Sequence, residues 1–154
     1  MKLINEGLLP FDLSEVEKSN FWNRATFAEK EKFISAVTTI TTLVNMYQEK
    51  YWGKHTLKAE FIAMVLGDWW HDLVEAALNC LDDELEHWYD GNINEFSERL
   101  LDECVNSKKW IKTLKQAYRE NKSDIKEAVF DKEEGTYDIN LISDISDEYR
   151  DYLY

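Results

Sequence analysis

Hydrophobic residues recur every three to four positions along most of this chain, and that spacing predicts helices. The most regular series lies between Phe27 and Trp52, where a capping-box pattern (Thr26 and Glu29) precedes it and Gly53 follows it. We therefore predict one long helix over about residues 27–52. Its inward-facing positions, four or three residues apart, are Phe33, Val37, Ile40, Val44, Tyr47 and Tyr51.

A second periodic segment runs from Thr56, a candidate N-cap, to Asp90, and Gly91 follows as a stop signal. Gly67 lies inside it, and a glycine costs a helix about 1 kcal/mol relative to alanine, so we expect a kink or break at Gly67–Asp68. In the downstream half one face is apolar and predicted to be core. It carries Trp70, Val74, Ala77, Leu81, Leu85 and Trp88.

The opposite face of the same segment is acidic. Between Lys58 and Arg99 the chain has eleven Asp and Glu residues and no Lys or Arg. Like charges at i,i+4 destabilise a helix by roughly 0.2–0.5 kcal/mol per pair, so this face is either a solvated surface or a docking surface for a positively charged partner. We name it the acid stripe, and it consists of Asp68, Asp72, Glu75, Asn79, Asp82, Glu86 and Asp90.

The remaining pattern predicts a short helix over about residues 15–22, a third helix that ends near residue 105, a fourth that follows Ser107 and includes Arg119, and a shorter fifth that ends near residue 131. Residues 136–154 form an acidic tail that is a last helix or irregular. The candidate caps are Ser14, Asn92 or Asn94, Ser107, Ser123 and, for the tail, Ser146. The connections are short, which places consecutive helices antiparallel. We predict an all-α fold: a single domain over residues 1–154, built as a bundle of about five or six mostly antiparallel helices.

Composition supports this fold and limits the function. One Pro and five Gly disfavour an all-β or loop-rich fold, and 44% apolar residues are enough for a core. The net charge of −13 is distributed in blocks along the chain: residues 82–103 carry −8, residues 104–130 carry +4 and residues 131–154 carry −6. Such blocks argue against direct binding of nucleic acid or of an anionic membrane, and fit a basic protein partner or a metal.

Targeting and redox signals indicate a cytoplasmic protein. Cys80 and Cys104 lack metal-type spacing, and we expect two free thiols in a reducing compartment. The N-terminal segment has no basic region followed by an apolar run, so we do not expect a signal peptide. No stretch approaches 18 apolar residues, so we expect no membrane span.

Catalytic and metal motifs have little support. Two acid-x-x-His pairs, Asp68/His71 and Glu84/His87, resemble half-sites of di-metal bundles, but sixteen residues of helix separate them by roughly 24 Å. We expect these histidines to make local ion pairs instead, and we expect no cofactor. No nucleophile motif or glycine-rich phosphate loop occurs, so a metal-dependent or other helical enzyme remains only an alternative.

Aromatic residues and one basic face complete the candidate chemistry. We expect Trp69 and Tyr89 to point off the apolar face, beside the acids, where aromatic anchors and carboxylates together are typical of protein interfaces. An outward-facing cationic set is expected to pair with the protein's own acids rather than with nucleic acid. It consists of Lys108, Lys109, Lys112, Lys115 and Arg119.

These observations define a candidate surface for a basic protein partner. Its residues are Asp68, Trp69, Asp72, Glu75, Asp82, Asp83, Glu86, Tyr89, Asp90, Glu95, Glu98 and Asp102. In size, acidity and helical content the chain resembles, at class level, the bacterial immunity proteins that neutralise toxins, including those of contact-dependent inhibition systems. The resemblance implies an inhibitor that occludes the cationic cleft of a cognate toxin, and a nuclease is the preferred toxin. The alternative is a nucleic-acid-mimic anti-defence protein of phage origin. Stoichiometry and oligomeric state are left open.

Overall fold

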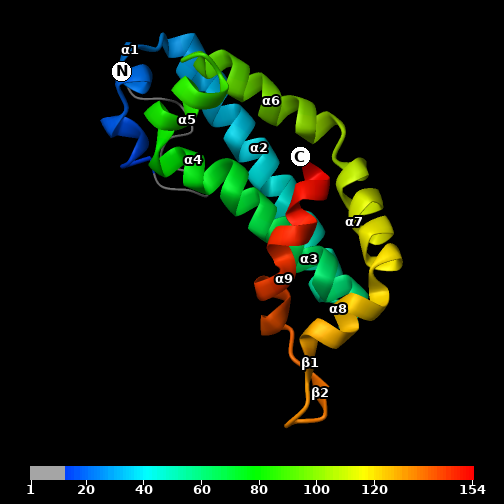
Figure 1. The fold of residues 1–154 in the computed structure, drawn as a ribbon. Helices are drawn as coiled ribbons and strands as arrows, with labels where there is room; N and C mark the ends of the chain where they lie inside the picture. The colour runs from blue at the N-terminus through cyan, green and yellow to red at the C-terminus, as the bar shows by residue number, and fades with distance from the viewer. Residues whose placement is uncertain (1–12) are drawn as a thin grey trace. The chain divides into compact units, whose positions relative to one another are not determined.

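A computed structural model describes residues 13–154, and these residues are predominantly helical (Figure 1). The prediction of an all-α fold is confirmed in class, since one two-stranded hairpin is the only sheet within residues 13–154. The number of helices was wrong, because the elements run from α1 to α9 rather than to five or six. The physical reason is that two predicted helices are interrupted.

The contacts divide the described chain into two compact units. The first contains the chain up to Leu43 together with His71–Val105, and the second contains Val44–Trp70 together with Asn106–Tyr154. The long helix α2 (Phe27–Trp52) contributes residues to both units. That the chain is a single domain stays a prediction.

The predicted capping box sets the start of α2. The Thr26 amide donates to the Glu29 carboxylate at 2.9 Å, and the Glu29 amide donates to the Thr26 hydroxyl at 3.1 Å. Two amides that have no partner inside the helix are thus satisfied reciprocally. The helix ends at Trp52, directly before Gly53, so the bounds predicted from local sequence signals are confirmed.

The second predicted helix is not continuous. It starts as expected after Thr56, whose hydroxyl accepts a hydrogen bond from the Ala59 amide at 3.2 Å, and Gly67 lies inside a regular helix rather than at a kink. The interruptions come later, at a π-helix and at Cys80, whose ψ of 48° is not helical. The elements are α3 (Leu57–Trp70), the π-helix η3 (His71–Glu75), α4 (Ala76–Asn79) and α5 (Leu81–Trp88).

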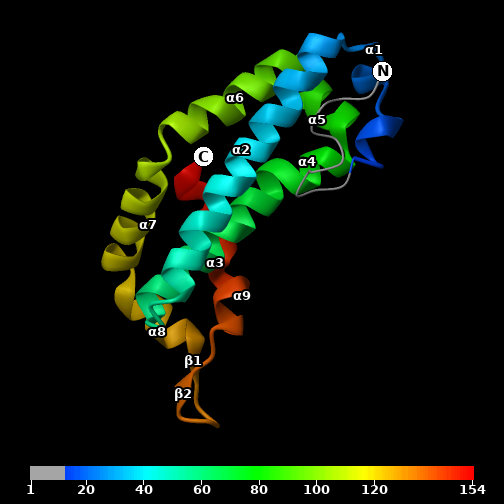
Figure 2. The same cartoon turned by 180° about the vertical axis from the view of Figure 1, so that it is seen from behind.

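The rest of the first unit frames α5. A 3-10 turn, η2 (Val16–Lys18), and a short helix α1 (Asn20–Arg24) replace the single helix predicted after Ser14. The third predicted helix is confirmed as α6 (Ile93–Val105). Figure 2 labels α1, α5 and α6 of this unit as seen from behind. In the core of the unit the ring centroid of Phe33 on α2 lies 5.4 Å from that of Trp22 and 5.9 Å from that of Phe96.

In the second unit α3 packs against α7 (Lys108–Glu120) and α9 (Asn140–Arg150), and α8 (Lys122–Val129) packs against α9 (Figure 1). Phe61 lies at the centre, with ring centroids 5.5 Å from Tyr118 and 5.1 Å from Tyr149. Strands β1 (Phe130–Asp131) and β2 (Thr136–Tyr137) form the hairpin, and the 3-10 turn η4 (Asp151–Leu153) follows α9.

Two predicted caps of this unit were wrong. Asn121 rather than Ser123 precedes α8, and Ser146 is buried inside α9 rather than placed at its start. The helix predicted to run to about Asp131 is α8, which ends at Val129, so Phe130 and Asp131 pair with β2 instead of continuing the helix.

Candidate partner-binding surface

Trp69 and Trp88 exchange the positions that α-helical periodicity predicts for them. Trp69, expected beside the acids, is 0% exposed and packs on Trp110 at 5.1 Å between centroids. Trp88, expected in the core, is 69% exposed. The π-helix holds one additional residue, which rotates the residues before it by about 100° relative to those after it, where the predicted core positions Val74 and Leu85 remain buried. The expected surface position of Trp69 was therefore wrong.

Asp82 has a structural role. Its carboxylate accepts hydrogen bonds from the Ser19 hydroxyl at 2.5 Å and from the Asn20 and Phe21 amides at 3.0 and 3.1 Å. Burial alone would raise the pKa of Asp82, but these hydrogen bonds and the charge of Arg24 hold it below its ordinary value. The acid that lies at the middle of the predicted surface is thus committed to the start of α1.

Free carboxylates and an exposed indole come together on α5. Asp83 and Glu86 are exposed, and with Glu84, His87 and Trp88 they line a shallow hollow of about 440 Å³. The His87 and Trp88 rings meet edge to face at 4.7 Å between centroids. We call Asp83, Glu86 and Trp88 the α5 surface.

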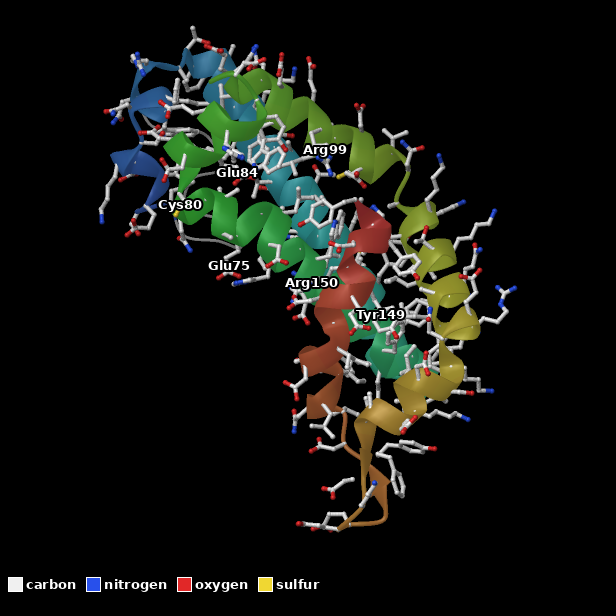
Figure 3. The ribbon with its side chains drawn as sticks, viewed as in Figure 1. Glu75, Cys80, Glu84, Arg99, Tyr149 and Arg150 are labelled. Carbon is white, nitrogen blue, oxygen red and sulfur yellow. The ribbon has the colours of Figure 1, made fainter. Side chains whose placement is uncertain are left out.

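Glu84 differs from its acidic neighbours because it is partly buried. Burial raises the pKa of Glu84, and the nearby His87 opposes that rise. Figure 3 labels Glu84 on α5 and Arg99 on α6, two helices of the same unit. Three acids in the first turn of α5 also favour the helix itself, because negative charge at a helix N-terminus interacts well with the helix dipole.

Tyr89 belongs to the core rather than to the surface. It is buried and its ring lies 5.1 Å from that of Phe96. Burial raises the pKa of Tyr89, while the charge of Arg99 and a hydrogen bond from it lower that pKa. Its expected place at the acidic edge was therefore wrong, and α5 ends one residue before it.

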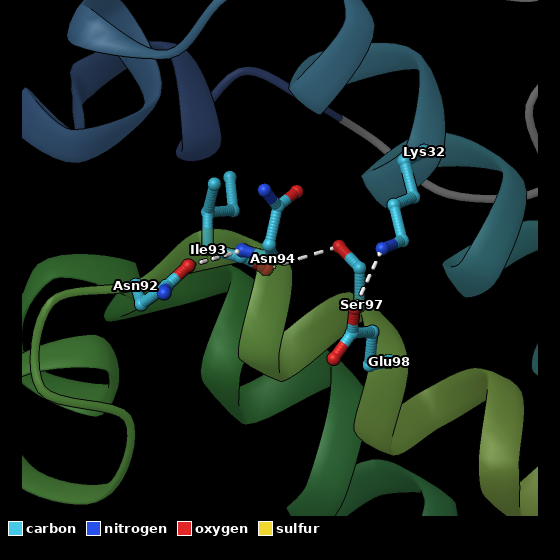
Figure 4. A network of polar contacts seen from close by, with 6 residues as sticks. All are labelled: Lys32, Asn92, Ile93, Asn94, Ser97 and Glu98. Carbon is cyan, nitrogen blue, oxygen red and sulfur yellow. Dashed lines mark hydrogen bonds and ion pairs between the residues drawn. The ribbon is translucent and has the colours of Figure 1, made fainter.

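The acids of α6 are partly used in ion pairs. Glu98 pairs with Lys32 of α2 at 3.0 Å, in a network that also contains the Asn92 cap and the Ser97 hydroxyl bonded to the Ile93 carbonyl (Figure 4). Glu95 and Asp102 are exposed. The predicted second acidic face therefore exists on α6, and Glu98 within it is paired with Lys32.

The other predicted residues are spread over several elements. Glu75 bonds His71 at 2.9 Å, which is a local pair of the kind expected for that histidine. Asp90 is exposed and has a φ of 52°, in the left-handed region that ends α5 together with Gly91. Asp72 is half-buried in η3, and Asp68 is half-buried in α3, which belongs to the second unit. The acid stripe is thus not a single helical face.

Neither a cluster of metal-ligating side chains nor a membrane-spanning helix is found in the described part of the chain. Within residues 13–154 no group of three or more His, Cys, Asp and Glu side chains is placed to hold a metal ion. No helix in that range is long and apolar enough to cross a membrane.

Sequence reasoning missed Trp88 as a surface residue. The available signal was local: three consecutive acids, Asp82 to Glu84, are typical of a helix start, and a start there implies a short helix whose last residue is Trp88.

Comparisons with known proteins assign this chain to no family. The chain matches no protein-family model, no curated protein and no solved structure.

Proposed function

We propose that this protein is an inhibitor that binds a basic protein through the α5 surface and neutralises it, as an immunity protein neutralises a toxin. The preferred candidate for the partner is a nuclease, because a nuclease must hold phosphates in a cationic cleft that an acidic protein can occlude. The observation that carries the proposal is the 69% exposure of Trp88 in a hollow that the exposed carboxylates Asp83 and Glu86 also line.

The chemistry of this surface favours a protein partner. An exposed tryptophan is costly to leave in water, and tryptophan is enriched among the residues that dominate binding energy at interfaces. Neighbouring carboxylates speed encounter with a cationic surface by electrostatic steering. A nucleic-acid mimic would instead need a regular row of free carboxylates, and here Asp82 and Glu98 are engaged within the protein.

The test needs a candidate partner, which is the C-terminal domain of any large secreted protein that a neighbouring gene is found to encode. That domain is expressed with this protein, and cell survival, nuclease activity and affinity at about 50 and 300 mM NaCl are measured. We expect wild-type protein to protect cells. Replacing both carboxylates (Asp83→Lys with Glu86→Lys) should weaken binding at least tenfold and flatten its salt dependence, and Trp88→Ala should weaken it at either salt concentration.

The matched control makes the same charge change on exposed acids of the second unit, Glu127→Lys with Glu133→Lys. It should protect as wild type does. Protection that survives the α5 substitutions, or that the control abolishes, would contradict the proposed surface. Equally tight binding to several unrelated DNA-binding proteins would favour the mimic, and stoichiometric iron, manganese or zinc in the purified protein would favour the enzyme alternative.

A further inference from the structure

A groove between α8 and α9 forms entirely within the second unit and shares no residue with the α5 surface. Its volume is about 340 Å³. One wall comes from α8 and its cap, and the other comes from α9 and η4. The lining residues are Asn121, Asp124 and Ala128 on the first wall and Ile145, Glu148, Tyr149 and Tyr152 on the second.

Two stacked tyrosines form the aromatic part of the groove. The Tyr149 and Tyr152 rings are 6.2 Å apart between centroids and only 19° from parallel. Tyr149 is buried and held edge to face against Phe61, and Figure 3 labels it on α9. Tyr152 is 50% exposed, so its accessible ring stacks on the buried ring of Tyr149.

The charged part of the groove is negative on both walls. Asp124 on α8 and Glu148 on α9 are exposed, and neither makes an ion pair within residues 13–154. Burial raises the pKa of Tyr149, and the charges of Glu148, Asp124 and the neighbouring Tyr152 raise it further. The tyrosine therefore stays protonated at neutral pH, and the groove offers no positive charge of its own among its lining residues.

We propose that this groove binds an organic cation, an alkylammonium or guanidinium group, with its charge between Asp124 and Glu148 and its aliphatic stem against Tyr152 and Ile145. Cations are attracted to the faces of aromatic rings, and carboxylates on two sides supply charge-assisted hydrogen bonds. An anion would meet two negative charges in the same space.

The test is an NMR titration of the full-length protein with butylguanidinium and with its uncharged analogue N-butylurea. We expect saturating shifts of the Tyr149 and Tyr152 ring signals with the cation only, weaker at about 300 mM than at about 50 mM NaCl. Asp124→Asn with Glu148→Gln should weaken binding at least fivefold, and Tyr152→Leu should weaken it without changing the charge.

The matched control is Glu127→Gln, which removes one exposed acid of α8 that does not line the groove. It should leave the affinity unchanged. Equal shifts with N-butylurea, shifts that do not saturate, or an unchanged affinity in the Asp124/Glu148 double variant would overturn the proposal. The substituted side chains are all exposed in the wild-type protein, and thermal unfolding of each variant checks that it is folded.

Two sources could supply the cation, and the same titration separates them. Tighter binding of spermidine than of a blocked tripeptide with a central arginine indicates a free polyamine. The reverse order indicates an arginine or lysine side chain of a protein. Either order supports the groove as a cation site, and failure of both ligands overturns it without bearing on the α5 surface.

Discussion

The hydroxyl of Ser19 donates a 2.5 Å hydrogen bond to the carboxylate of Asp82, 63 residues further along the chain. Ser19 is also the N-cap of α1, since its hydroxyl oxygen accepts from the Trp22 amide at 3.1 Å. With the Asn20 and Phe21 amides bound to the same carboxylate, one acid of α5 satisfies most of the free donors at the start of α1.

Removing that charge should destabilise the first unit. We expect Asp82→Asn to lower the free energy of unfolding by about 1–2 kcal/mol, because the amide accepts these hydrogen bonds less strongly than a carboxylate. Urea unfolding measures the change. Asp83→Asn, one residue away and exposed, is the control and should stay within about 0.5 kcal/mol of wild type. Equal losses would mean that general charge, not the hydrogen bonds, matters.

The same contact should respond to pH. The folded pKa of Asp82 lies below its ordinary value of 3.8, because its hydrogen bonds and Arg24 outweigh the effect of burial. Ionised Asp82 therefore contributes stability above pH 3.8, and that contribution is lost as the pH falls through the folded pKa. The stability difference between wild type and Asp82→Asn should shrink below about pH 4, as followed by urea midpoints at several pH values. A constant difference would contradict this account.

The two tryptophans with exchanged roles should differ sharply in stability. Trp69→Ala removes a fully buried ring and should cost about 3–5 kcal/mol, whereas Trp88→Ala should cost less than about 0.5 kcal/mol. Chemical unfolding gives both values. Quenching of tryptophan fluorescence by acrylamide should be weaker in Trp88→Ala than in wild type, because an exposed indole has been removed. A large loss in Trp88→Ala would show that its ring is covered in solution.

Gly67 makes room for one side chain of α2. A Cβ at residue 67 would clash with Nε2 of Gln48, which donates to the Ala63 carbonyl at 3.0 Å. Gly67→Ala alone should bring little or no gain, because displacing Gln48 offsets the better helix propensity of alanine. In a Gln48→Ala background the same change should stabilise the protein by about 1 kcal/mol. Thermal unfolding of the four proteins gives the coupling, and additivity would refute the close approach.

The two cysteines should react at different rates. Burial and the charge of Glu103 raise the pKa of Cys104 to about 11, so at pH 8 only about one thiol in a thousand is ionised. Cys80 is exposed. Labelling with a thiol-disulfide reagent should therefore show a fast phase lost in Cys80→Ser and a slow phase lost in Cys104→Ser. Two phases of equal rate would contradict the assigned burial.

Local signals predicted much of the fold. The bounds of α2 follow from the Thr26/Glu29 box, the regular apolar series and Gly53, all within the helix or next to it. The starts at Thr56 and Asn92 are equally local. The π-helix and the break at Cys80 were not predictable in this way, because the cost of interrupting a helix is repaid by packing with distant residues.

For the candidate surface, the sequence predicted which acids are exposed but not which residues are engaged in contacts within the protein. Exposure of Asp83, Glu86, Glu95 and Asp102 follows from their charge. The engagement of Asp82 depends on Ser19, and the burial of Tyr89 depends on Phe96, contacts that periodicity along one helix does not contain. Trp88 was assigned to the core because the helix was assumed to continue past it.

The π-helix at His71–Glu75 also limits where this chain tolerates a change of length. A π-turn contains one residue more than an α-turn, so deleting one residue within this segment would allow α-helical hydrogen bonds to run through it. The same deletion would rotate the residues before it by about 100° relative to those after it, and would therefore turn the buried Trp69 out of the position that packs on Trp110.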